Sequence, residues 1–206
     1  MTKRTAGQYA RAARDFYATP EAAILKLLPH IGEIETFAEP MCGDGAIPRT
    51  LEPLGWRCTA AWDIEPQGEM VGRAGVYDVL MLQAKDFKGC DAIISNPPWP
   101  WPSNMRGGQP EGTPTIQIIQ HLMAIRPTWL ILSADFMHNR YFESFAPHCP
   151  KIVSAGRVKW MAGTKNTGFD NAAWYLFDQF HHGDGPTLVA NTESAVSYHP
   201  SIEGVL

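Results

Sequence analysis

The chain has 206 residues, of which 45% are hydrophobic and 18% charged, and its formal net charge is −4 with a pI of about 5.9. This ordinary globular composition suits one domain with a sizeable core, and the chain is too short for two comfortable domains. The acidic balance argues against a protein that coats nucleic acid through its overall charge, although it leaves local basic patches open.

Periodicity along the chain predicts alternating helices and strands. The first helix is expected to start at Pro20, with Thr19 as its cap and Pro29 just past its end. Further helices are expected at 46–54 and from 113 to 126, and strands at 34–38, 57–64, 91–95, 129–133, 151–160 and 172–180. The last two strands should pair as an antiparallel hairpin. This order predicts an α/β doubly wound sheet with an antiparallel edge. We expect one domain over residues 1–180, followed by a loosely packed tail over 181–206.

The four cysteines, at positions 42, 58, 90 and 149, form neither a CxxC pair nor a Cys/His pattern with metal-ligand spacing. We therefore expect buried free thiols and no metal site. No apolar stretch approaches about 18 residues, and the polar N-terminus lacks a signal-peptide core. These features predict a cytoplasmic protein without membrane contact.

The stretch Asn96-Pro97-Pro98-Trp99 directly follows the strand expected at 91–95. Its two prolines fix φ and lack N–H donors, so the turn presents an amide side chain, a fixed backbone carbonyl and a large flat ring. That set suits a planar group carrying an NH2, with two acceptors for its hydrogens and an aromatic face to stack on. A proline-rich turn with a core tryptophan is the alternative that these four residues alone leave open.

A glycine loop, residues 39–45, separates the first strand from the helix expected at 46–54. Gly43 and Gly45 allow a ligand to approach the backbone, but the loop lacks the further glycine or lysine of a phosphate-binding loop. Its first residue, Glu39, suits a cationic group such as an α-ammonium. Asp63, at the end of the next strand, can accept hydrogen bonds from ribose hydroxyls. The pattern predicts a nucleoside cofactor with an amino acid end and no phosphate.

In order and spacing these motifs resemble those of class I S-adenosylmethionine-dependent methyltransferases, specifically DNA adenine-N6 methyltransferases, over about residues 14 to 180. Asn96–Trp99 matches the catalytic tetrapeptide of that family, which begins with Asn or Asp and ends with an aromatic residue. The resemblance implies a Rossmann-like, mostly parallel sheet of roughly seven strands and S-adenosylmethionine as the cofactor. It assigns cofactor contacts to Tyr17, Thr19, Glu39, Cys42, Gly43, Gly45, Asp63, Ile64, Asp86 and Phe87.

The implied activity is methyl transfer to the exocyclic N6 amine of adenine in DNA, with the base flipped out of a duplex or already single-stranded. The Asn96 side-chain oxygen and the Pro97 carbonyl would accept the two amine hydrogens and so aim the nitrogen lone pair at the methyl group. Trp99 would form one wall of the slot for the base. Further substrate contacts are expected from Pro98, Trp101, Arg106, Lys165 and Phe169.

Sequence-specific members of this family carry a separate target-recognition domain, and the chain resembles a small, phage-type member without one. We therefore expect relaxed or very short sequence specificity, with an affinity for DNA that falls as salt rises. Three alternatives stay open: a methyltransferase acting on RNA adenine, one acting on a protein glutamine amide, and a non-catalytic cofactor-binding subunit. A cytosine-N4 enzyme would more typically have Ser in place of Asn96.

Overall fold

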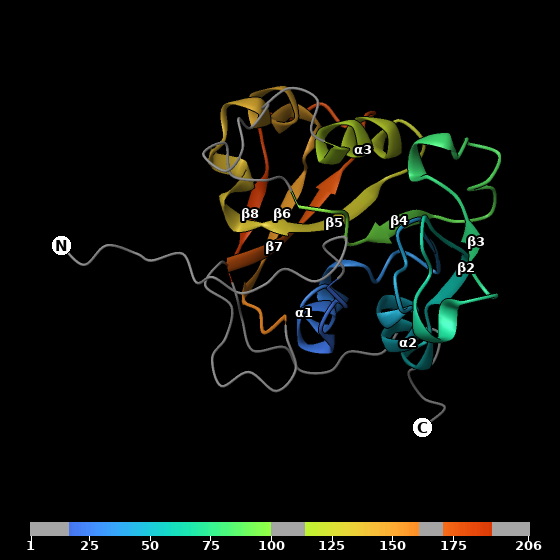
Figure 1. Ribbon diagram of the computed structural model, residues 1–206. Coiled ribbons are helices and arrows are strands. Elements are labelled where there is room, and N and C mark those ends of the chain that lie inside the picture. The colour runs from blue at the N-terminus through green and yellow to red at the C-terminus, as the bar shows by residue number, and fades with distance from the viewer. Residues whose placement is uncertain (1–16, 100–113, 161–170, 191–206) are drawn as a thin grey trace, which may run out of the picture.

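One sheet lies between two helical layers (Figure 1). This computed structural model describes residues 17–99, 114–160 and 171–190, and those residues form eight strands. In chain order the strands are β1 (Thr36–Glu39), β2 (Arg57–Asp63), β3 (Gly75–Val76), β4 (Ala92–Ser95), β5 (Thr128–Ser133), β6 (Lys151–Arg157), β7 (Asn171–Phe177) and β8 (Thr187–Val189).

The strands lie in the order β3-β2-β1-β4-β5-β7-β6-β8. All neighbours from β3 to β5 are parallel, β7 is antiparallel to both β5 and β6, and β8 is parallel to β6. The predicted mostly parallel, Rossmann-like sheet with an antiparallel hairpin near its C-terminal end is confirmed, with one strand more than expected among the described residues.

Helices cover both faces of the sheet. Figure 1 shows α1 (Glu21–Leu25) and α2 (Ala46–Leu51) on one side and α3 (Pro114–Met123) on the other. Short 3-10 segments complete the layers: η2 (Leu28–His30), η3 (Glu52–Leu54), η4 (Gly68–Met70), η5 (Val79–Met81), η6 (Ala134–His138), η7 (Arg140–Ser144) and η8 (Ala146–His148). Because both faces are covered, all four residues of β1 and of β4 are buried, which explains their continuous apolar runs.

Each face of the sheet carries its own hydrophobic cluster. On the α1 and α2 side the helical residues pack on Phe37, Ile94 and Ile131 of the sheet. On the opposite side α3 and the aromatic rings of η6 to η8 pack on alternate residues of the same strands, such as Ile93 and Leu130. The alternation follows from the period of two along a strand.

Two expected details about helices are wrong. α1 begins at Glu21 with Pro20 as its N-cap and no capping side chain, so Thr19, which is buried, is not the cap. The helix expected at 46–54 ends at Leu51 and continues as η3, because Pro53 has no N–H to extend the α-helical hydrogen bonds.

The expected domain boundary at residue 180 is also wrong. β8 extends the sheet beyond β6, so the first part of the presumed loose tail belongs to the domain. Only three residues form this strand, too few for an alternation pattern to predict it. No helix in the described part of the chain reaches the length and hydropathy that a bilayer crossing requires.

Candidate functional site

The chain reverses its direction across the sheet between β1 and β4. It runs outward from β1 through β2 to β3, and then returns to place β4 on the other side of β1. Ligands of doubly wound sheets bind outside the carboxyl ends of the strands at such a switch point. Glu39 ends β1, Asp63 ends β2 and Asn96 directly follows β4. Because these strands are parallel, the three side chains that the sequence singles out meet at one edge.

Backbone hydrogen bonds tie the glycine loop to the end of β2. The Cys42 N–H donates to the Trp62 carbonyl at 2.9 Å, and the Gly43 N–H donates to Asp63 Oδ2 at 2.8 Å. Gly43 and Gly45 have φ values of 52° and 77°, a left-handed conformation that side chains with a Cβ rarely adopt. At Gly45 a Cβ would also lie 2.7 Å from the sulfur of Met70. The two glycines are therefore required by the turn itself.

Glu39 is a buried acid with an unsatisfied oxygen. The residue is 2% exposed, and within the described ranges its Oε2 has no hydrogen-bond partner. Burial raises the pKa of this carboxyl well above its usual value, and the nearby Asp44 and Asp63 raise it further. Since an unpaired buried charge is costly, the site as it stands favours a protonated Glu39 and suits a cationic ligand group that would pair with the ionised form.

Asp63 is fixed by two backbone donors. Its Oδ2 accepts from Gly43 and its Oδ1 accepts from the Glu65 N–H at 2.8 Å. Each carboxylate oxygen has a second lone pair, so both can still accept a ribose hydroxyl. Ile64, the next residue, is 66% exposed and leaves an apolar side chain beside that carboxylate.

The end of β3 adds two residues that sequence reasoning missed. Val76 lies opposite Asp63, and the Tyr77 N–H donates to the Asp63 carbonyl at 3.1 Å. Tyr77 is exposed, and Asp78 follows it as the cap of η5, accepting from the Leu80 N–H through Oδ1. An exposed ring and an acid thus stand next to Ile64 and Asp63. The signal available in the sequence was weak, because β3 has only two residues.

The pair Asp86-Phe87 is engaged in contacts of its own. Phe87 is 1% exposed and packs its ring on Trp62, with centroids 5.3 Å apart, inside the core. Asp86 accepts from the Gln83 N–H at 2.8 Å and so closes a surface turn before β4. The burial of Phe87 leaves its ring little surface for the expected cofactor contact.

Asn96 is held by its amide nitrogen. Its Nδ2 donates to the backbone carbonyl of Tyr17 at 3.3 Å, which brings the segment before α1 to the end of β4. A carbonyl only accepts, so the nitrogen is the amide atom that faces Tyr17 and Oδ1 points elsewhere. Thr19 follows two residues later and is buried. Tyr17, Thr19 and Asn96 are therefore brought to the same end of the sheet.

The rest of the tetrapeptide is anchored on both sides. The Thr115 hydroxyl of α3 donates to the Pro98 carbonyl, and the Trp99 indole Nε1 donates to the Ile131 carbonyl of β5 at 3.1 Å. The Trp99 ring also meets Trp160 edge-on, with centroids 5.1 Å apart and planes at 85°. Trp160 lies just beyond β6 and was not among the expected site residues. Trp99 is thus a rigid, half-buried ring rather than a free surface side chain.

Four of the expected substrate contacts cannot be placed. Trp101, Arg106, Lys165 and Phe169 lie outside the residues that the structure describes.

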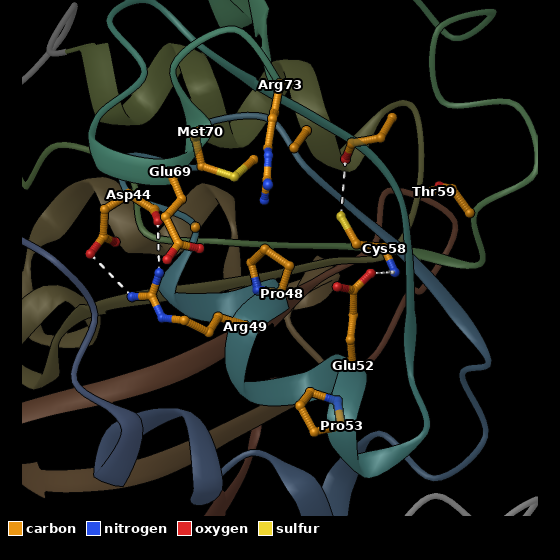
Figure 2. A pocket seen from close by; sticks show the side chains of 13 residues that line it. Asp44, Pro48, Arg49, Glu52, Pro53, Cys58, Thr59, Glu69, Met70 and Arg73 are labelled. Carbon is orange, nitrogen blue, oxygen red and sulfur yellow. Dashed lines mark hydrogen bonds and ion pairs between the residues drawn. The ribbon is translucent and has the colours of Figure 1, made fainter.

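A hollow of about 510 Å³ lies beside the glycine loop, between α2, β2 and η4 (Figure 2). It exists because residues 64–74 form only η4, which leaves most of β2 half-buried. Its walls mix Asp44, Glu52 and Glu69 with Arg49 and Arg73, and Arg49 pairs with Asp44 at 3.2 Å. Glu39, Asp63 and Asn96 do not line it, but Gly45 of the glycine loop does, so the hollow adjoins the site at the strand ends through that loop.

The described residues fit a nucleoside cofactor with an amino acid end. Glu39 has a buried oxygen without a partner, the glycine loop offers close backbone approach, and Asp63 has spare lone pairs beside the exposed Ile64 and Tyr77. Among the described ranges, no group of three or more His, Cys, Asp or Glu side chains is arranged to hold a metal ion. Of the cysteines, Cys42, Cys90 and Cys149 are buried and Cys58 is half-buried, and all four are free thiols as expected.

No protein-family model and no curated protein matches the chain. Its structure is similar to that of a proposed RNA methyltransferase from Pyrococcus horikoshii, with a TM-score of 0.56 and 18% identity over 85% of this chain and 93% of that chain. It is also similar to a proposed class I S-adenosylmethionine-dependent methyltransferase from Listeria monocytogenes, with a TM-score of 0.54 and 14% identity over 91% of this chain and 68% of that chain. A third similar structure is a modification subunit of a proposed type I restriction enzyme from Vibrio vulnificus. The match has a TM-score of 0.47 and 14% identity, and it covers 90% of this chain and 49% of that chain. The first two likenesses agree with the strand order and the hairpin, and the chain has the fold of class I S-adenosylmethionine-dependent methyltransferases.

Proposed function

We propose that this protein transfers a methyl group from S-adenosylmethionine to the exocyclic N6 amine of adenine in DNA, with the base flipped out or unpaired. The proposal rests on two side chains that lie at the switch point, at the ends of adjacent strands. Glu39 at the end of β1 offers a buried, unpartnered oxygen, and Asn96 after β4 offers an amide whose nitrogen is already held. A cation site and an amine site on adjacent strands suit a methyl donor with an amino acid end and an acceptor with an NH2 group.

The proposed cofactor site uses residues from four segments. Glu39 would pair with the α-ammonium, Gly43 and Gly45 would let the cofactor approach the backbone of the loop, and Asp63 would accept from the ribose hydroxyls. Ile64 and Tyr77 would contact the base of the cofactor, with Asp78 in place of Asp86 as the polar contact. When bound, S-adenosylmethionine supplies an electrophilic methyl group on a sulfonium.

Asn96 and Pro97 prepare the acceptor amine. The lone pair of an aromatic amine is delocalised into its ring, which makes the nitrogen a poor nucleophile. Asn96 Oδ1 and the Pro97 carbonyl each accept one amine hydrogen and draw the nitrogen towards tetrahedral geometry. Fixed dipoles at the right distance supply most of the rate enhancement, and no side-chain nucleophile takes part.

The aromatic wall for the base is Trp99. Its indole N–H is bound to Ile131 and its edge is held by Trp160, so stacking a base on it costs little side-chain entropy. Flipping an adenine out of a duplex costs a few kcal/mol, and stacking on an aromatic ring returns about 1–3 kcal/mol per base. We propose relaxed or short sequence specificity, with selection mainly for the flipped base.

RNA is the second candidate substrate. The similar structure from Pyrococcus horikoshii is a proposed RNA methyltransferase, and an unpaired adenine in RNA presents the same amine. The net charge of −4 suits neither nucleic acid in particular.

The decisive experiment incubates the purified protein and tritium-labelled cofactor with duplex DNA, single-stranded DNA, RNA and a protein extract. We expect label in DNA, at N6 of adenine after digestion. Asn96→Ala should abolish transfer while calorimetric cofactor binding stays close to that of the wild type. Label confined to RNA or protein would replace the proposed substrate, and near-normal transfer by Asn96→Ala would overturn the mechanism.

A further inference from the structure

The Asn96 amide makes a hydrogen bond in which only its nitrogen can take part, because the partner is a backbone carbonyl. Its nitrogen donates to the Tyr17 backbone carbonyl at 3.3 Å, across 79 positions of sequence. Among the described residues this is the contact that decides which amide atom faces the site. With the nitrogen engaged, the oxygen is the atom left to accept a hydrogen from the target amine.

We propose that the Tyr17 carbonyl orients the Asn96 amide for methyl transfer, and that this contact makes Asn, and not Asp, the residue that this chain requires at position 96. The role in transfer rests on the proposed function, whereas the contact itself does not. Tyr17 acts here through its backbone as a positioning residue, and its side chain is free for another role.

An aspartate at position 96 could make this contact only in its protonated form. Its carboxylate has no donor to offer the Tyr17 carbonyl, so two acceptor oxygens would face each other in a half-buried place. Protonation removes the conflict, because the hydroxyl can donate to Tyr17 while the other oxygen accepts from the amine. Both the repulsion and the partial burial therefore raise the pKa of a carboxyl introduced by Asn96→Asp.

Other acids at this edge act in the same direction where they are ionised. Asp63 ends β2, and Glu39, which ends the neighbouring strand β1, contributes only at a pH above its own raised pKa. Across the site, the segment before α1 contributes the Tyr17 carbonyl, and α3 contributes Thr115, which carries no charge. The contribution of Tyr17 is separated from that of Glu39 by making Asn96→Asp in a Glu39→Gln background.

The first readout needs neither cofactor nor substrate. We measure the melting temperatures of the wild type and of Asn96→Asp from about pH 4 to about pH 9. The introduced carboxyl has an ordinary pKa of about 3.9 when unfolded and a raised one when folded, so the variant is nearly as stable as the wild type at the acidic end. Its stability should fall relative to the wild type as pH rises through the raised pKa, and the same trend should persist in the Glu39→Gln background.

Asn139→Asp is the matched control. The Asn139 amide nitrogen also donates to backbone carbonyls, those of Asp135 and Phe136, at 2.8 and 3.2 Å, and Asn139 is an exposed residue between η6 and η7 that does not belong to the proposed site. It should lose stability with rising pH in the same direction, by a smaller amount because Asn139 is exposed, and keep unchanged methyl transfer, which separates loss of an amide contact from loss of orientation at the site.

The second readout is single-turnover methyl transfer against pH. At about pH 8 we expect Asn96→Asp to be about tenfold or more slower than the wild type, and to approach the wild-type rate as pH falls through the raised pKa. A stability difference that does not change with pH would show that the nitrogen does not face Tyr17. A clear stability trend with wild-type transfer at pH 8 would show that the contact has no catalytic role. Failure of the wild type to methylate any substrate would instead remove the proposed function and leave the stability result standing.

Discussion

At the scale of single residues, Glu39 stands out in the described structure as a buried carboxyl with an unsatisfied oxygen. Burial raises its pKa and two further acids raise it more, while Arg49, whose charge lowers the pKa, is engaged with Asp44. A carboxyl whose pKa is higher when folded than when unfolded contributes stability at low pH and loses that contribution as pH rises. Without a ligand, the protein should therefore become less stable as pH rises from the ordinary Glu range through the raised value.

We predict that cofactor binding expels this proton. The cationic end of the cofactor pairs with ionised Glu39, so binding below the raised pKa must release close to one proton, and affinity should rise by up to about tenfold per pH unit in that range. Titration calorimetry in buffers of different ionisation enthalpy counts the protons. Glu39→Gln should release no proton and should bind the cofactor about tenfold or more weakly. Without ligand, its melting temperature should no longer fall as pH rises through the raised pKa of Glu39. Equal proton release by both proteins would contradict this assignment.

A second residue-scale prediction compares Asp78 with Asp86. Asp78 follows the end of β3, next to Ile64 and Tyr77, whereas Asp86 closes a turn through the Gln83 N–H. We expect Asp78→Asn to weaken cofactor binding about tenfold, the loss of one charge-assisted hydrogen bond. Asp86→Asn should leave binding within about twofold and shift stability only slightly. Calorimetry with the cofactor and a thermal melt of each variant decide between them, and the reverse ranking would restore Asp86 to the site.

The positions of some residues at this edge could be predicted from the sequence alone, and those of others could not. Glu39, Asp63 and Asn96 could be predicted because each ends an apolar strand, and strand ends of a parallel sheet share one edge. Phe87 could not, because an aromatic residue after an acid looks the same whether it faces a ligand or the core. The contact between Asn96 and Tyr17 depends on long-range packing, and no local pattern carries it.

At the scale of elements, α3 and β5 hold the tetrapeptide from both sides. The Thr115 hydroxyl donates to the Pro98 carbonyl and the Trp99 indole donates to the Ile131 carbonyl, so the turn is anchored to the elements on both sides. The position of the Pro97 carbonyl follows from these anchors, because Pro97 lies between Asn96 and Pro98.

We predict that Thr115→Val slows methyl transfer as well as destabilising the fold. The change keeps the shape and removes a buried hydrogen bond, which should cost about 1–3 kcal/mol of stability and lower kcat about tenfold with little change in KM. Thr128→Val is the matched control, since Thr128 is equally buried, donates to the Arg126 carbonyl at 2.7 Å and lies at the opposite end of β5. Equal losses of kcat in both variants would mean that only global stability is involved.

The expected element boundaries are wrong where a proline or a very short strand is involved. Pro53 converts the end of the helix expected at 46–54 into η3, a step that composition indicates but does not locate. β3 has two residues and β8 has three, and strands of that length are defined by their neighbours in the sheet more than by their own sequence.

At the scale of the whole molecule, the strand order places the two halves of the proposed chemistry on either side of the switch point. The cofactor half occupies β3, β2 and β1, and the acceptor half occupies β4 and β5 with the hairpin beside them. The doubly wound class of the sheet and its antiparallel hairpin could be predicted from the alternation of helices and strands. The far edge could not, because the chain turns back there to form β8.

The last prediction concerns that edge. β6 would be exposed without β8, which pairs with Lys151, Ile152 and Val153. The approach to β8 is tied by a Gly183 N–H that donates to Pro147 at 2.9 Å and by a His148 Nδ1–H that donates to the His181 carbonyl at 2.8 Å. A chain that ends at residue 180 loses several such bonds at about 1 kcal/mol each. We expect it to be about 3 kcal/mol less stable, to melt about 10 °C lower and to associate through the open edge.

A chain that ends at residue 190 keeps every one of these hydrogen bonds and is the appropriate control. Thermal melts and sedimentation of the two truncated proteins against the full chain provide the measurement. Because β6 and β8 lie far from the switch point, the shorter protein should bind the cofactor with unchanged affinity below its melting range. If the chain ending at 180 melts with the full protein and stays monomeric, β8 contributes nothing to the fold and the domain does end at the hairpin.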